Sequence, residues 1–133
     1  MFSIINIENE VFNTVSNALR AVYGDNIVVS GEYNETPSAF PFVTLIEDDN
    51  YEVEETRTLA RLPETASNLT YTANVYSNLK SGCKTQAKSI MDIVDEQMHN
   101  MGFQRNSRNQ LPNIDRTIYR VTARYTQVIQ IFQ

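Results

Sequence analysis

Residues 69–76 read LTYTANVY and decide how this chain folds. One set of alternating side chains is apolar or aromatic: Leu69, Tyr71, Ala73 and Val75. The set between them is mostly polar: Thr70, Thr72, Asn74 and Tyr76. An alternation with a period of two residues is typical of a β-strand with one buried face. The stretch therefore predicts a strand whose apolar face packs on helices.

The preceding segment, FPFVTLIEDDNYEVE (40–54), has a broken alternation. Residues of one parity change from apolar to acidic and back: Val43, Leu45, Glu47, Asp49 and Tyr51. We therefore expect this strand to leave the core midway. Together with the strand over residues 69–76, this segment predicts a long hairpin whose acidic tip, approximately 47–67, projects into solvent or toward a partner.

Two stretches have the three- and four-residue spacing of amphipathic helices. Over residues 7–23 the apolar positions are Ile7, Val11, Val15, Ala18 and Val22. In the second stretch they are Ala87, Ile90, Met91, Val94, Met98 and Met101. Gly24 and Gly102 follow the two stretches and can take the left-handed conformation that ends a helix. On the polar face of the second helix, Lys88 and Asp92 have the spacing of an i,i+4 ion pair.

The last part of the chain predicts one long strand over residues 116–131. Its inward positions are Tyr119, Val121, Ala123, Tyr125, Ile129 and Ile131, and its outward positions are Arg116, Arg120 and Arg124. The stretch RNSRNQLPN (105–113) is typical of a polar turn, and Ile27–Ser30 predicts a short strand. The elements predict an α+β fold in a single domain over residues 1–133: a mixed or antiparallel sheet of about four to five strands, two helices packed on it and the projecting hairpin.

The chain has 133 residues and a net charge of -5, but its acidity is concentrated in one segment. Six acids and no base lie within nine residues: Glu47, Asp48, Asp49, Glu52, Glu54 and Glu55. The other ten acids are balanced by eleven Lys and Arg. From Phe103 onward there are five Arg and one acid. Separated acidic and basic surfaces allow copies of a chain to bind one another, although a solvated acidic loop is an equal alternative.

The residues offer little for catalysis or cofactor binding. There is no Gly-rich phosphate loop or metalloprotease motif, and a nucleophile–base pair would have to join Cys83 to His99. These two lie sixteen residues apart on one expected helix, roughly 24 Å at 1.5 Å per residue, which excludes a hydrogen bond. The acidic segment lacks the spacing of a calcium-binding loop. We therefore expect no enzyme activity, no metal and no cofactor.

Contacts with nucleic acid or a membrane are also disfavoured. Arg116, Arg120 and Arg124 form a stripe on one face of the expected strand. A protein that binds single-stranded nucleic acid usually adds exposed aromatic side chains, but the Tyr residues of this strand fall on the opposite face. No apolar run approaches the roughly 20 residues that cross a bilayer. The opening MFSIINIENE lacks the pattern of a signal peptide, so we expect synthesis inside a cell and no membrane partner.

Four stretches together resemble one protein family: IENEVFNTVSNALRA (7–21), FPFVTLIEDDNY (40–51), NVYSNLKSGCKTQAKSIMDIVDEQMHNMGFQR (74–105) and IYRVTARYTQVI (118–129). They are similar to the tail terminator, or tail completion, proteins of long-tailed phages and prophages. The resemblance covers nearly the whole chain and is strongest over residues 74–105. It carries no catalytic signature.

This resemblance implies a structural virion protein at the head-proximal end of the tail, assembled in the host cytoplasm. Its subunits would close into a homohexameric ring that ends tube polymerisation and offers a surface for head–tail joining. The implied partners are other copies of the chain, the major tail tube protein and the head–tail connector or stopper protein, while genomic DNA passes through the bore without specific binding.

The charge pattern suggests site residues within such a ring. Glu47, Asp48, Asp49, Glu52, Glu54 and Glu55 would line the lumen, where they repel DNA phosphates, or form an arm that contacts a neighbour. In the second case they would meet bases such as Arg116, Arg120 and Arg124. The apolar chain end, with Ile129, Ile131 and Phe132, would pair with a neighbouring sheet edge or be buried in its own core.

Two other functions fit the residues. A head-completion or neck adaptor protein shares the size, ring symmetry and acidic character, and gene order beside a major tail protein would separate it from a terminator. A small monomeric ligand- or metal-binding domain is the alternative from a different class, and it predicts specific binding of a divalent cation or a buried polar pocket.

Overall fold

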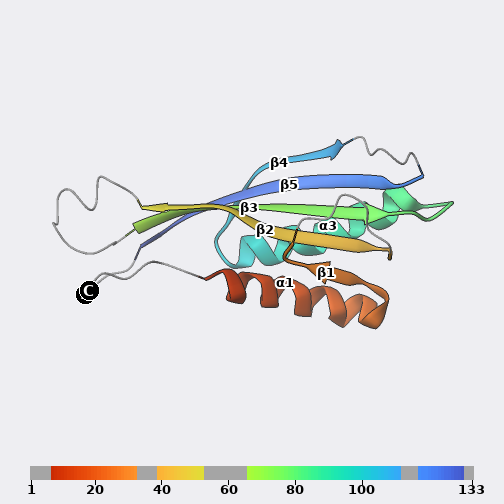
Figure 1. The fold of residues 1–133 in the computed structure, drawn as a ribbon, viewed down its shortest axis with the longest axis horizontal. Coiled ribbons are helices and arrows are strands. Elements are labelled where there is room, and N and C mark those ends of the chain that lie inside the picture. The colour runs from red at the N-terminus through yellow and green to blue at the C-terminus, as the bar shows by residue number, and fades with distance from the viewer. Residues whose placement is uncertain (1–6, 33–38, 53–65, 112–116, 131–133) are drawn as a thin grey trace.

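The computed structural model of the chain describes residues 7–32, 39–52, 66–111 and 117–130. Its two long helices are α1 (Glu8–Tyr23) and α3 (Cys83–Asn100), and a 3₁₀ turn, η1 (Gly24–Asn26), follows α1. The strands are β1 (Val28–Ser30), β2 (Phe42–Glu52), β3 (Ala66–Ser77), β4 (Gln104–Leu111) and β5 (Tyr119–Gln130). The predicted α+β class is confirmed (Figure 1).

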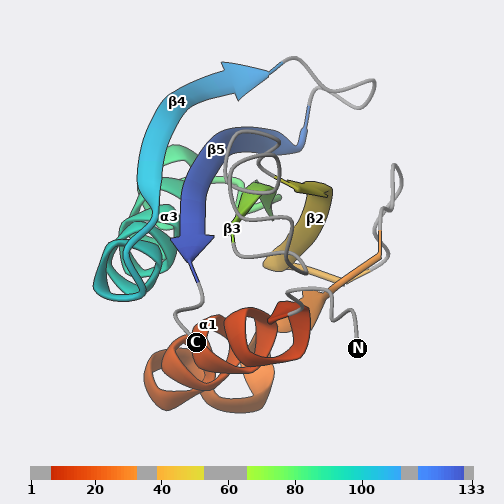
Figure 2. The same cartoon turned by 90° about the vertical axis from the view of Figure 1, so that its left-hand side faces the viewer.

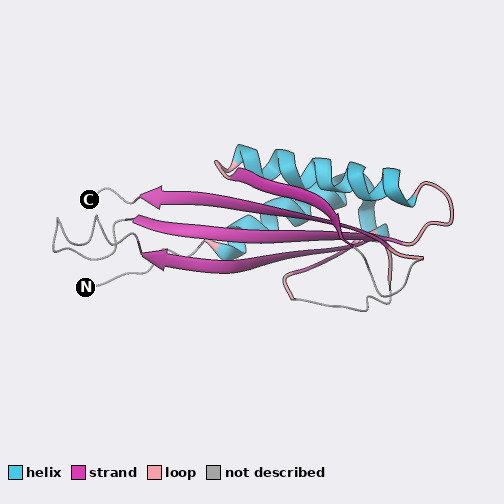
Figure 3. Cartoon of the chain, turned by 90° about the horizontal axis from the view of Figure 1, so that it is seen from above, coloured by secondary structure: helices cyan, strands magenta, loops and turns pink. Residues whose placement is uncertain are grey.

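The five strands form one mixed sheet in the order β1-β2-β3-β5-β4. β1 runs parallel to β2, and the other neighbours are antiparallel. Both helices lie on the same side of the sheet, as the end-on view and the view from above show (Figures 2 and 3). We call the opposite side, on which no described helix lies, the open face.

The core lies between the sheet and the helices, where the predicted periodicities place it. The sheet contributes Val43, Leu45, Leu69, Tyr71, Ala73, Val75, Val121, Ala123 and Tyr125. The helices contribute Val11, Val15, Leu19, Ala87, Ile90, Met91, Val94 and Met98. Each large apolar side chain buried here stabilises the fold by about 1.5–3 kcal/mol relative to exposure. Val22 departs from the predicted stripe, because 64% of its surface is exposed.

A β-bulge in β2 explains the broken alternation. Glu47 pairs with Tyr71 and Asp49 pairs with Thr70, so Asp48 is an extra residue between two consecutive partners on β3. The extra residue shifts the side-chain parity by one and puts Asp49 on the same face as Thr70. The strand therefore continues past the acids, up to Glu52. Residues 53–65, which the predicted hairpin tip includes, lie outside the described residues.

The prediction of a polar turn over residues 105–113 was wrong for its first seven residues, which lie in β4. This strand pairs with β5 from Gln104 opposite Thr126 to Leu111 opposite Arg120. It forms an edge of the sheet and buries none of its side chains deeply, so no apolar alternation marks it. The single long strand expected over 116–131 is observed as β5, which begins at Tyr119.

Candidate interaction surfaces

The bulge divides the acidic segment between two faces of the sheet. Glu47 lies on the helix side, where its carboxylate accepts a hydrogen bond from the Tyr71 hydroxyl over 3.1 Å. Asp48 lies on the open face and accepts a hydrogen bond from the Thr72 hydroxyl. Asp49 is exposed. The acids that the structure describes therefore do not form one continuous surface.

The remaining acids are only partly placed. Glu52 is the last residue of β2, and its backbone pairs with Ser67. Glu54 and Glu55 lie outside the described residues, as does Arg116 among the predicted bases. Whether the segment lines a lumen or contacts a neighbour stays a prediction.

Glu47 lies close to a second carboxyl group. Burial raises the pKa of Glu47 above its ordinary value, and the carboxyl of Glu8, at the start of α1, raises it further. The hydrogen bond from Tyr71 acts in the opposite direction. A carboxyl group in this environment holds its proton more tightly than one in water.

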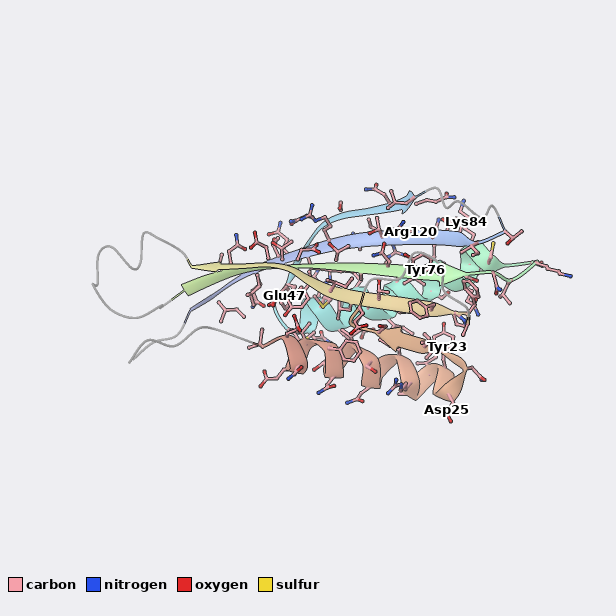
Figure 4. The ribbon with its side chains drawn as sticks, viewed as in Figure 1. Tyr23, Asp25, Glu47, Tyr76, Lys84 and Arg120 are labelled. Carbon is pink, nitrogen blue, oxygen red and sulfur yellow. The ribbon has the colours of Figure 1, made fainter. Side chains whose placement is uncertain are left out.

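Arg120 is engaged within its own subunit. Its Nε and a terminal nitrogen donate hydrogen bonds of 3.1 and 3.0 Å to the side-chain oxygen of Asn74. Its guanidinium also lies 5.4 Å from the ring centre of Tyr76, a cation–π distance (Figure 4). Arg124, four residues further along β5, is exposed. The two predicted outward bases therefore differ: Arg124 is available to a partner, whereas Arg120 is largely committed to the sheet.

The open face is hollowed and polar. A depression of about 460 Å³ runs across β2, β3, β5 and β4, and both Arg120 and Arg124 line it together with Asp48. Most of the other lining side chains are short and uncharged: Thr72, Asn74, Ser107, Asn109 and Thr122. A surface of this composition resembles the polar part of a protein–protein interface more than an apolar ligand pocket.

Arg105 and Arg108, which belong to the predicted basic end of the chain, lie on the helix side instead. Arg108 donates to Asp92 of α3 over 2.7 Å and to the backbone oxygen of Lys88 over 3.1 Å. Asp92 therefore pairs with Arg108, and the i,i+4 pair with Lys88 that its spacing predicted is not the one found. Arg105 lies 3.3 Å from Asp95.

Asp95 has three partners, which come from three different elements. The hydroxyl of Tyr125 donates to it over 3.2 Å, the imidazole Nδ1 of His99 lies 3.1 Å away, and Arg105 completes the group. Burial of the Tyr125 hydroxyl, and next the charge of Asp95, raise the pKa of Tyr125 above its ordinary value. These contacts of Asp95 join α3, β4 and β5. The sequence spacing indicates only one of them, the i,i+4 pair of Asp95 and His99.

The apolar end of the chain is described only as far as Gln130. Ile129 is half-buried and packs against its own core, whereas 55% of the neighbouring Val128 is exposed. Ile131 and Phe132 lie outside the described residues. The role predicted for these residues at a subunit interface stays a prediction.

Cys83 and His99 occupy the first and the second-last positions of α3, as predicted, so they cannot pair within one subunit. None of the described helices is both long and apolar enough to cross a membrane.

The chain is similar to the sheath/tube terminator of an extracellular contractile injection system, PVC, in its extended state, with 14% identity and a TM-score of 0.46. The similarity covers 99% of this chain and 59% of that chain. No family model and no curated protein matches the sequence.

Proposed function

We propose that this chain is a tail terminator, a structural subunit that closes with other copies into a ring on the end of a phage tail tube and stops its growth. The observation that carries the proposal is that this small subunit exposes acids and bases on different elements. The acids Asp48 and Asp49 lie in β2, whereas the exposed bases Lys84 and Lys88 lie on α3. Such a subunit attracts its own copies.

Further support comes from the resemblance of four sequence stretches to tail terminator proteins and from the unpaired outer edge that β4 presents in the described sheet. A free strand edge can pair with another chain, either a second copy or a tube subunit. In the proposed ring, acids that do not meet a neighbouring subunit line the bore and keep it negative, so that DNA passes without binding. The connector or stopper protein would bind the ring on the side away from the tube.

Native mass spectrometry over a concentration series, followed by electron microscopy of any large species, tests the proposal first. We expect closed rings, with six subunits as the resemblance implies. The functional test adds the protein to growing tail tubes of the phage or prophage that encodes it, and we expect tube length to stop increasing. A chain that neither closes into rings nor caps its tubes would rule out the terminator function.

A neck adaptor would give a different pattern in the same assays. It forms a ring as well, but it binds the portal side of the head–tail junction and leaves tube growth unchanged. The tube-length assay therefore separates the two functions, whereas ring formation alone does not.

A further inference from the structure

The sheet has two free edges among the residues that the structure describes. β4 lies along one margin and β1 along the other, and no described strand lies outside either of them (Figure 1). The side chains of β4 are exposed or half-buried, and none of them is a proline. An edge of this kind presents unpaired backbone N–H and C=O groups to another chain. β1 is shorter, Val28–Ser30, and presents fewer such groups.

β4 is weakly protected against pairing with another strand. Edge strands are commonly guarded by charged side chains or by a bulge. The two charges of β4 are drawn onto α3, where Arg105 meets Asp95 and Arg108 meets Asp92. A bulge follows Arg105, and beyond it the register with β5 is unbroken over Ser107–Leu111. This part of β4 therefore forms a regular edge that a further strand can extend.

The strand directions make the two edges compatible with one another. β1 runs parallel to β2, and the other neighbours in the sheet are antiparallel, so β4 runs opposite to β1. When two copies stand side by side with their helices on the same side, β4 of one copy lies antiparallel to β1 of the other. Antiparallel pairing is slightly more stable per residue than parallel pairing, because its hydrogen bonds are perpendicular to the strands.

The register of the sheet fixes which backbone groups point outward at each edge. The N–H of Val28 donates to the carbonyl of Pro41 over 3.1 Å, so the backbone groups of Val28 face β2 and those of the next residue, Val29, face outward. The same alternation crosses the sheet through three facing pairs: Phe42 with Tyr76, Val75 with Val121, and Arg120 with Leu111. The backbone groups of Leu111 therefore face β5, and those of Gln110 face outward.

We infer that the outer edge of β4 pairs with the outer edge of β1 in a second copy of this chain, so that one sheet continues from subunit to subunit. The inference rests on the self-association in the proposed function and names the two strands that meet. The outward groups of Val29 bond those of Gln110 in the second copy. This register sets Val28 opposite Leu111 of that copy.

The side chains on the open face fit this register. Val28 alternates with the core residue Val29 and so points to the open face, and 37% of it is exposed. Leu111 lines the depression on the same face and is half-buried. In the joined sheet these two apolar side chains lie side by side and shield one another from water. A register shifted by two residues would place Val28 against the polar Asn109 instead.

The same register brings two opposite charges together. Glu32 is exposed, and so is Arg124, which has no ion pair among the residues that the structure describes. Ser107 pairs with Arg124 of its own β5, and Glu32 of the second copy comes to the other side of Ser107. The backbones of Glu32 and Arg124 are then about 10 Å apart, two strand spacings, which their long side chains span over the short serine. The contact therefore gains an ion pair across the two copies.

Because β1 and β4 are different strands, the contact is heterologous. Each copy uses β4 on one neighbour and β1 on the other, and all helices lie on one side of the continuous sheet. Such contacts generate a closed ring when the rotation between copies closes. Pairing of β4 with β4 would instead use the same edge twice and stop at a two-fold dimer.

Paired cysteines test the contact directly. In a Cys83→Ser background, Val28→Cys/Leu111→Cys places one pair of thiols at every junction. The two positions form a non-hydrogen-bonded pair with Cα atoms about 4.5 Å apart, which suits a disulfide. We expect mild oxidation to give a ladder of disulfide-linked multimers that ends at the closed ring. The control Val28→Cys/Gln110→Cys puts the second thiol on the other face of the sheet, and we expect about tenfold less cross-linking.

Two outcomes of the cross-linking would overturn the inference. The first is that no ladder forms, either with the chain alone or with the chain bound at the ends of its tubes. Capping of the tubes by that same chain would still uphold the terminator function. The second is a cross-linked dimer of the single variant Asn109→Cys in place of the ladder, because Asn109 lies opposite its own copy when β4 pairs with β4.

Charge reversal provides an independent test of the register. At low ionic strength we expect Glu32→Arg and Arg124→Glu each to weaken self-association about fivefold, and Glu32→Arg/Arg124→Glu to recover native association within about twofold. The controls Glu96→Arg and Arg20→Glu make the same charge changes at exposed helix positions, and each should change association less than about twofold. Circular dichroism checks that all variants fold. A folded double variant that associates more weakly than both single variants would overturn the inference.

Discussion

The Tyr71 hydroxyl donates a hydrogen bond of 3.1 Å to the carboxylate of Glu47, its partner across β3 and β2, at the point where the sheet passes from apolar to acidic. The carboxyl of Glu8 lies against the same group from α1. Burial raises the pKa of Glu47 above its ordinary value of 4.5, so the folded chain holds this proton more tightly than the unfolded chain does.

The raised pKa predicts how stability depends on pH. Between 4.5 and the raised pKa of Glu47 the folded state binds more protons than the unfolded state, so the free energy of unfolding falls as pH rises through this window. Glu47→Gln keeps an acceptor for Tyr71 and removes the charge. We expect a higher urea midpoint than that of the native chain at neutral pH and no difference below pH 4.5. The exposed control Glu96→Gln should not show this pattern, and a lower midpoint for Glu47→Gln at neutral pH would contradict it.

Gly102 is expected to tolerate no side chain. Its φ is +92°, and a Cβ placed there would lie 2.5 Å from the side-chain nitrogen of Gln127. We expect Gly102→Ala to lower the free energy of unfolding by more than about 1 kcal/mol. Gly31→Ala is the matched control, because its Cβ would meet no atom closer than 3.8 Å, and its effect should stay within about 0.5 kcal/mol. Equal effects in chemical denaturation would show that the strain at Gly102 is absent.

The hydrogen bond between Tyr125 and Asp95 predicts a stability difference between two tyrosines. Tyr125→Phe removes the 3.2 Å bond and leaves Asp95 with Arg105 and His99, so we expect a loss of about 1 kcal/mol in urea denaturation. Tyr23→Phe, at the more exposed end of α1, serves as control and should change stability by less than about 0.5 kcal/mol. If both variants lose the same amount, the bond to Asp95 contributes nothing of its own.

Arg108 joins the edge strand β4 to α3, so its loss should destabilise β4 locally. Arg108→Ala removes the bonds to Asp92 and to the Lys88 backbone, a loss of only about 0.5–1 kcal/mol because the pair is partly exposed. We expect faster amide hydrogen exchange in β4, with β3 unchanged, since edge strands open before central ones. Arg20→Ala on α1 is the control. Uniform acceleration over the whole sheet would instead indicate global destabilisation.

The helices and central strands could be predicted because their burial follows a local period. The apolar spacing predicted a helix over residues 7–23, and α1 spans Glu8–Tyr23. The alternation over 69–76 lies within β3, and its apolar positions are all buried. Val22 fits the same period and is nevertheless exposed, whereas the neighbouring Tyr23 packs against the core.

The bulge and the edge strand could not be predicted from periodicity. The sequence shows that the alternation of apolar and polar residues is interrupted around Glu47. The same interruption is expected of a strand that ends there and of a strand that contains an extra residue. Only the pairing with β3 distinguishes them, since it is the partner strand that defines an extra residue. β4 has few buried side chains, so its strand conformation depends on backbone hydrogen bonds to β5 and on arginine bonds to α3.

The sequence by itself determined the class of fold, the apolar faces of the helices and central strands, and the presence of separate acidic and basic segments. These properties depend on residues that are neighbours along the chain. Only the tertiary structure decided which partner each arginine binds, because Arg108 meets Asp92 across 16 positions and Arg120 meets Asn74 across 46. An ion pair depends on distance in space, and the sheet register sets that distance. For this reason Arg124 is exposed, whereas Arg120, on the same arginine stripe, is bound within the sheet.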